Sequence, residues 1–156
     1  MTEYRFRPRF VILAWSAIGV GGFAMGMAWV MQLAGQSLWV TLGFGAAGVV
    51  LGSLYLASPA WRYRALVDDD GLEVIDGRGD RRFRIEWSEV DRCIASPSTK
   101  TCYVSGGSAE RSLIVPGQGA VAPYDIDHKR ALYDEIVKRV PPERIEQVDL
   151  VEHAER

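Results

Sequence analysis

The amino-acid sequence predicts an α+β membrane protein. A hairpin of two transmembrane helices is expected first, followed by a domain of antiparallel strands with one helix at its C-terminal end. Three observations predict this arrangement. No Asp, Glu, Lys or Arg occurs from Phe10 to Trp61, and a bilayer favours such a segment because charged side chains are costly at its centre. Short segments of alternating polarity follow it, and one stretch of helical periodicity comes after them.

The uncharged segment is long enough for two membrane crossings, since one crossing takes about 20 apolar residues. A polar break at residues 32–37 divides it, so we expect helices at about 10–31 and 38–56, within a hairpin of residues 10–61. Pro59 ends the second helix, because proline disfavours helix in the residue before it. A signal peptide is the alternative for the first helix, but a second apolar run follows at once.

Arginines flank the predicted hairpin on both sides and are absent from its connecting turn. Because cytoplasmic flanks carry an excess of Lys and Arg, both termini and the following domain are expected in the cytoplasm. The basic N-terminus is then residues 1–9. We interpret five residues as juxtamembrane topology determinants: Arg5, Arg7, Arg9, Arg62 and Arg64.

Glycine pairs spaced four residues apart occur in both predicted helices, Gly22 with Gly26 and Gly48 with Gly52. Small side chains let helix backbones approach closely in lipid. The pairs indicate either a dimerisation face or packing within the hairpin, and the second interpretation is favoured because such spacings are common in glycine-rich spans.

Residues 62–140 are expected to form one small cytoplasmic domain. Turn sequences rich in Asp and Gly separate short alternating segments. Strands are predicted at 63–67, 72–75, 82–87, 90–95, 101–105 and 112–115. An amphipathic helix is predicted over about 125–140, docked on an open end of the strands, because its apolar residues share one stripe: Ile126, Tyr133, Ile136, Val137 and Val140. The acidic tail, residues 141–156, is expected to be loosely held.

Two segments, Asp70–Val74 and Arg84–Val90, resemble the bacterial pleckstrin-homology (PH) domains. The second matches their I-P-W-x-E-I pattern except that Glu86 replaces the usual proline; the matching positions are Ile85, Trp87, Glu89 and Val90. The resemblance covers about residues 63–140. It implies a seven-strand, two-sheet, partly open barrel capped by a C-terminal helix. The chain is also similar to small members of this family that are anchored by two spanning helices. This similarity implies a protein of the bacterial cytoplasmic (inner) membrane.

No catalytic constellation is evident, so we expect no enzyme, no cofactor and no metal site. His128 and His153 lie near no nucleophile motif, and Cys93 and Cys102 are expected to be free thiols. The consecutive carboxylates at 68–70 lack the spacing of a calcium loop and indicate a hairpin turn. Nucleic acid is not an expected partner, because the domain is close to neutral and has no basic stripe. A small-molecule ligand is not expected either.

The leading hypothesis is a membrane-anchored, non-enzymatic PH-like interaction module. It would bind a protein partner or self-assemble at the cytoplasmic face of the bilayer. The alternative is a sensor of anionic lipid headgroups that uses Arg81, Arg82 and Arg84. These lie near the position where, as the resemblance implies, eukaryotic PH domains bind phosphoinositides. Arginine forks match phosphate geometry, although neighbouring carboxylates dilute the local charge.

Overall fold

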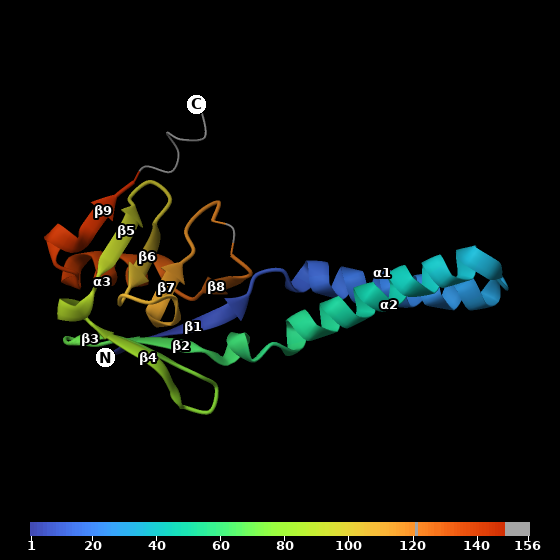
Figure 1. The fold of residues 1–156 in the computed structure, drawn as a ribbon, viewed down its shortest axis with the longest axis horizontal. Coiled ribbons are helices and arrows are strands. Elements are labelled where there is room, and N and C mark those ends of the chain that lie inside the picture. The colour runs from blue at the N-terminus through green and yellow to red at the C-terminus, as the bar shows by residue number, and fades with distance from the viewer. Residues whose placement is uncertain (121, 149–156) are drawn as a thin grey trace. The chain divides into compact units, whose positions relative to one another are not determined.

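The computed structural model describes residues 1–120 and 122–148 and has an α+β architecture (Figure 1). The chain divides into two compact units. We call Phe10–Ser58 the hairpin unit, and Met1–Arg9 together with the chain from Pro59 onwards the sheet unit. The end of the predicted acidic tail, residues 149–156, lies outside the described residues.

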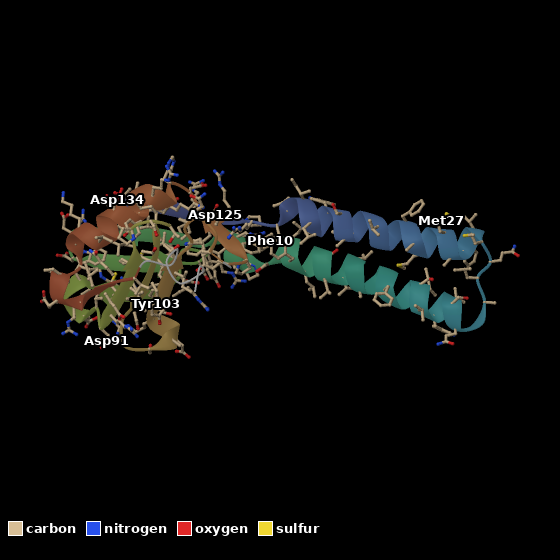
Figure 2. All side chains as sticks on the ribbon, turned by 90° about the horizontal axis from the view of Figure 1, so that it is seen from above. Phe10, Met27, Asp91, Tyr103, Asp125 and Asp134 are labelled. Carbon is tan, nitrogen blue, oxygen red and sulfur yellow. The ribbon has the colours of Figure 1, made fainter. Side chains whose placement is uncertain are left out.

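The hairpin unit consists of α1, Val11–Val30, and α2, Gly35–Ala57, which lie side by side in Figure 1. Both helices are long and apolar enough to cross a membrane. Their large apolar side chains are mostly exposed, for example Trp29 at 86% and Phe44 at 79%, whereas a core helix of a soluble protein would bury them. In Figure 2 the side chains of this unit are mainly carbon, while nitrogen and oxygen atoms gather over the sheet unit.

The second helix begins three residues earlier than predicted, at Gly35 rather than Leu38. Gly35 has a φ of +62°, which glycine adopts without strain, so the chain can reverse direction there. Ser37 donates a hydrogen bond from Oγ to the carbonyl oxygen of Ala34 at 2.9 Å. Gln36 and Ser37, which were assigned to the connecting turn, therefore belong to the first turn of α2, whereas Gln32 remains in the turn between the helices.

The two helices meet backbone to backbone at glycines. A Cβ on Gly21 would overlap the carbonyl oxygen of Gly45, and one on Gly52 would lie 2.7 Å from that of Ala14. Gly48 is in the same interface, since its Cβ would lie 2.8 Å from the carbonyl oxygen of Ala17. Helices whose backbones approach this closely gain dispersion contact, the main packing energy available to helices in lipid.

The sheet unit contains two sheets. The first has the strand order β4-β3-β2-β1-β8 and the second β7-β6-β5-β9. The first sheet comprises β1 Thr2–Pro8, β2 Arg64–Val67, β3 Gly71–Ile75, β4 Arg81–Glu86 and β8 Tyr124–Ile126. The second comprises β5 Arg92–Ser96, β6 Thr101–Ser105, β7 Ser112–Val115 and β9 Ile145–Gln147. Within the described residues no ladder joins the two sheets, so they do not close into a barrel of the kind that the resemblance implied.

The N-terminal residues form a strand, which the sequence analysis did not predict. β1 pairs antiparallel with β2 on one side and with β8 on the other. Its side chains Tyr4 and Phe6 are buried, at 3% and 7% exposure. Residues 1–9 are therefore part of the sheet unit rather than a separate flank. The apolar hairpin occupies the place of the turn between paired strands β1 and β2.

This pairing also corrects the start of the C-terminal helix. Residues 124–126 pair with β1 as β8, so the helix α3 runs only over Lys129–Arg139, after His128 in a left-handed conformation with φ +52°. Leu132, Tyr133 and Ile136 of α3 are buried in the core. The predicted stripe is thus split, with Ile126 reaching the same core from β8.

The chain after Pro141 is also ordered as far as the structure describes it. A 3-10 turn over Pro142–Arg144 leads into β9, which pairs parallel with β5. Ile145 packs against the core, and the N–H of Val148 donates to the carbonyl of Ala95 at 3.0 Å. The segment pairs with the edge of β5 that β6 does not occupy. The acidic composition of the segment did not indicate this pairing.

Candidate functional site

An open cleft lies between the inner face of the first sheet and β7. Its volume is about 540 Å³, within the usual range for ligand and peptide pockets. Four aromatic side chains line it, together with aliphatic residues and two charged ones: Phe6, Tyr63, Phe83, Tyr124, Val74, Leu113, Ser112, Arg82 and Glu110. The cleft thus exposes polar and apolar surface in nearly equal amounts, and its cation and anion can orient a ligand.

Side chains rather than strand pairing hold the two sheets together around this cleft. Arg111 donates to the carbonyl of Arg84 on β4 at 3.0 Å and forms an ion pair with Glu89 at 2.6 Å. Tyr124 of β8 donates from its hydroxyl to the carbonyl of Ile114 on β7 at 3.0 Å. Burial raises the pKa of this Tyr124 phenol, so it stays a neutral donor. β4 and β7 are both terminal strands, which leaves main-chain groups available for pairing.

The three arginines proposed as lipid-headgroup ligands do not form one cluster. Arg81 and Arg84 both pair with Glu73, at 2.9 and 3.2 Å. Arg82 instead lies over the ring of Tyr63, 5.6 Å from its centroid, where it lines the cleft. A β-bulge between Val74 and Ile75, in the pairing of β3 with β4, interrupts the regular alternation of side chains. The side chain of Arg82 therefore does not point in the same direction as those of Arg81 and Arg84.

Arg84 is a structural residue of the 68–71 turn. Its guanidinium contacts both carboxylate oxygens of Asp68, at 3.1 and 3.2 Å. Although burial opposes ionisation of Asp68, the N–H groups of Gly71 and Asp70 and the charge of Arg84 hold its pKa below the ordinary value. Arg139 pairs with Asp69 at 2.8 Å. The acidic run is therefore a braced turn, as the sequence indicated, and among the described residues no group of three or more potential metal ligands occurs.

The arginines predicted to be juxtamembrane belong to the folded sheet unit, where most of them have defined partners. Arg5 and Arg7 lie on β1, Arg64 on β2, and Arg62 in a 3-10 turn over Pro59–Arg62. Arg9 donates a hydrogen bond to the carbonyl oxygen of Ala120. Four of them line a second hollow, of about 360 Å³, together with Asp127.

The two cysteines are free and buried on neighbouring strands β5 and β6. Burial raises the pKa of Cys93 to about 11 and raises that of Cys102 further in the same direction. Neither thiol is poised as a nucleophile, since the thiolate is the reactive form. His128 is exposed at the start of α3.

The four glycines predicted to pack helices divide into two pairs with different surroundings. Gly48 and Gly52 of α2 lie in the hairpin interface, whereas a Cβ added to Gly22 or Gly26 of α1 would meet no atom within 4 Å. Gly21, one residue away, takes the interface position instead. Period and spacing alone could not tell which face of α1 meets α2.

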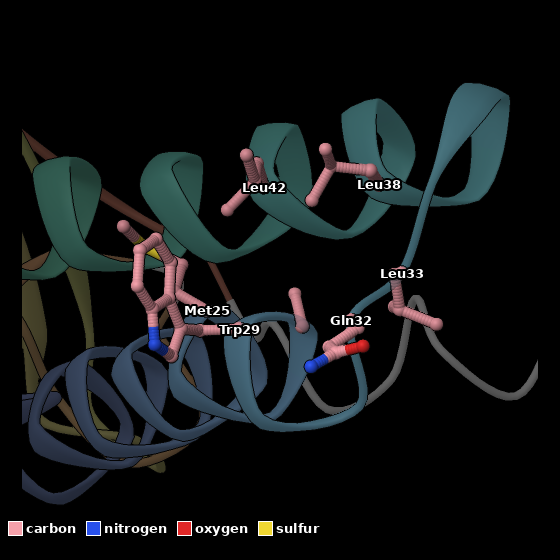
Figure 3. A pocket seen from close by; sticks show the side chains of 7 residues that line it. Met25, Trp29, Gln32, Leu33, Leu38 and Leu42 are labelled. Carbon is pink, nitrogen blue, oxygen red and sulfur yellow. The ribbon is translucent and has the colours of Figure 1, made fainter.

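An apolar hollow of about 510 Å³ lies near the turn of the hairpin unit. Figure 3 shows Leu38 and Leu42 of α2 across from Met25 and Trp29 of α1. Gln32 is its one polar side chain. The composition suits lipid chains or a further apolar helix, and nothing in it supports chemistry.

Comparison with protein-family models, with curated proteins and with solved structures finds no match for this chain. The geometry of the chain's own residues therefore carries the functional argument. That geometry offers an aromatic cleft and an arginine-lined hollow, both within the sheet unit.

Proposed function

We propose that the protein is a membrane-anchored, non-enzymatic interaction module with a PH-like domain. The hairpin unit spans the bacterial cytoplasmic membrane, and the cleft between the sheets binds an extended segment of a protein partner at the cytoplasmic face. The observation that carries this proposal is the aromatic cleft between β7 and the inner face of the sheet that ends at β4. A tethered module has a high effective concentration at the membrane, so modest affinity suffices.

The chemistry of the cleft favours a peptide over a small polar metabolite. Aromatic rings supply large contact area at low cost in conformational entropy, as in other recognition surfaces. The terminal strands β4 and β7 offer main-chain hydrogen bonds to an added strand. Arg82 and Glu110 can select the charge of the bound segment.

The anchoring half of the proposal draws support from the arrangement of β1 and β2. The residues just before and just after the apolar segment are paired strands of one sheet. Two crossings return the chain to its starting side, as this pairing requires. The arginines on both flanks favour the cytoplasm for that side.

Self-assembly through α1 is a related candidate, favoured by Gly22 and Gly26. These glycines are not used inside the hairpin and so leave a small-residue face on α1. Another α1 could pack on it with close backbone contact. The partner would then be a second copy of this chain.

Site-specific photo-crosslinking in intact membranes tests the proposal. A photoreactive residue replaces Phe83 or Ser112 in the cleft, and, as the matched control, Asp134 on the exposed face of α3. We expect the chain in the membrane fraction, and crosslinked adducts at the cleft positions only. An adduct of twice the monomer mass would identify self-assembly. Equal adduct formation at Asp134, absence of adducts at both cleft positions, or a water-soluble chain would reject the proposal.

A further inference from the structure

The hollow lined by juxtamembrane arginines has more positive charge than its neighbours balance. Arg5, Arg7, Arg62 and Arg64 line it. The carboxylates that face them are Asp127, 2.5 Å from Arg7, and Glu3, which contacts Arg5 at 2.8 Å and Arg64 at 3.6 Å. Four guanidinium groups therefore share two carboxylates.

Two of these arginines are placed where electrostatics opposes them. Arg5 of β1 and Arg64 of β2 are direct partners in the antiparallel register. Side chains in such pairs have Cβ atoms about 5 Å apart, and like charges there are destabilising. Glu3 relieves this repulsion only in part, because a single carboxylate lies between two guanidinium groups. A bound anion would relieve it fully.

Arg62 adds a guanidinium that has no ion pair in the part of the chain that the structure describes. Its position is nevertheless defined by packing. A Cβ on Gly77, in the β3–β4 turn, would lie 2.5 Å from the Cβ of Arg62, so only glycine lets the turn approach it this closely. The turn thus holds the stem of Arg62 at the hollow, where Gly77 also forms part of the lining.

We propose that this hollow binds a phosphate group through the forks of Arg5, Arg7, Arg62 and Arg64. Guanidinium forks bind phosphate oxygens in bidentate geometry. Arg7 lies three residues before the hairpin unit in the sequence, and Arg62 four residues after it. Phospholipid headgroups are therefore one source of the phosphate, and a soluble phosphate ester is the other. This inference does not depend on the peptide cleft, which has a different lining.

The test measures ligand binding to the full chain in nanodiscs. One arm compares phosphatidylglycerol with phosphatidylcholine discs by counting retained lipids with native mass spectrometry. The other arm titrates glycerol phosphate into phosphatidylcholine discs by calorimetry. Preference for phosphatidylglycerol alone identifies a lipid headgroup, and binding of glycerol phosphate identifies a soluble ester. Neither a lipid preference nor glycerol phosphate binding would overturn the proposal.

The variants separate a site from general attraction of basic residues to anionic lipid. Arg7→Gln with Arg62→Gln should weaken binding about tenfold or more, as expected for lost charged hydrogen bonds. Arg130→Gln with Lys138→Gln removes the same charge at exposed positions of α3 and should change binding less than about twofold. Equal loss in both would overturn the proposal.

Two further variants guard against misfolding. Arg62→Gln alone breaks no ion pair among the described residues, so it should keep the unfolding midpoint and still weaken binding. Lysine at positions 7 and 62 keeps the charge without the fork and should restore binding only in part. Full restoration by lysine, or unchanged binding in Arg62→Gln, would contradict recognition by guanidinium forks.

Discussion

Single arginines of similar sequence context have different roles because of their neighbours. Arg84 is 27% exposed at its side chain and contacts two carboxylates, whereas Arg81 is 61% exposed and contacts one. Charged hydrogen bonds gain strength where water is partly excluded. Arg84 should therefore contribute more to stability than Arg81.

Arg84→Gln is expected to destabilise the sheet unit by about 1–3 kcal/mol, since it leaves Asp68 and Glu73 without their shared cation. Arg81→Gln, the matched control, should cost less than about 1 kcal/mol. Urea unfolding of the full chain in detergent, followed by circular dichroism, measures both. Equal losses would show that the Asp68–Arg84 contacts add nothing to stability.

The same cluster predicts sensitivity to acid. The hydrogen bond from Arg81 is the main cause that holds the pKa of Glu73 below its ordinary value, and the pKa of Asp68 is also lowered. The unfolded chain therefore binds protons more readily, so this stabilisation is present above about pH 4.5 and is lost as pH falls through the lowered values. We expect the urea midpoint to drop between about pH 5 and pH 3, and to drop less in Arg84→Gln. An identical drop in the variant would assign the acid sensitivity to other carboxylates.

At the scale of elements, the sequence predicted the strands with strong turn signals well. β6 and β7 have the predicted bounds, and β2, β3 and β4 lie within a residue of theirs. The missed strands β1, β8 and β9 depend on pairing between distant segments. β1 does alternate, with Tyr4 and Phe6 between charged residues, but its place before the hairpin favoured a separate flank.

The candidate site was predicted less well than the fold. The sequence located arginines in the β3–β4 hairpin and on both sides of the apolar hairpin, but it could not assign their partners. Arg84 faces Asp68 because two neighbouring strands bring them together, and Arg5 faces Arg64 across a segment of more than fifty residues. The cleft itself arises where two sheets fail to close, which no local pattern encodes.

The hairpin interface predicts different effects for alanine at two adjacent glycines of α1. Gly21→Ala would bring a methyl group into overlap with the carbonyl oxygen of Gly45, so the helices must separate. Gly22→Ala, the control, meets nothing within 4 Å. We expect Gly21→Ala to lower the thermal midpoint of the hairpin unit in detergent, with a loss of about 1–3 kcal/mol. A cysteine crosslink between α1 and α2 should form less readily in Gly21→Ala only; equal crosslinking in both variants would contradict this interface.

At the scale of the whole molecule, the fold is assembled from two separated pieces of chain. The sheet unit takes β1 from before the apolar hairpin and all its other strands from after it. Pairing of β1 with β2 therefore closes a loop that contains the whole hairpin unit. The hairpin unit is joined to the sheet unit by two covalent connections, one before α1 and one after α2.

Deleting residues 2–9 is therefore expected to abolish folding of the sheet unit, even though these residues lie outside the domain that sequence patterns define. The deletion exposes β2 and β8 along their inner edges and removes Tyr4 and Phe6 from the core. Loss of two buried aromatic side chains alone costs about 3–5 kcal/mol each, comparable with the total stability of a small domain.

The truncated chain should still enter the membrane fraction, because both apolar helices remain, but it should lose its cooperative urea transition and its resistance to protease. Arg5→Gln, which keeps the strand and removes the like charge opposite Arg64, is the control and should retain both. Adding a peptide of residues 1–9 should restore part of the transition by strand addition. A cooperative transition at an unchanged midpoint in the truncated chain would show instead that β1 is dispensable and that the domain begins after the hairpin.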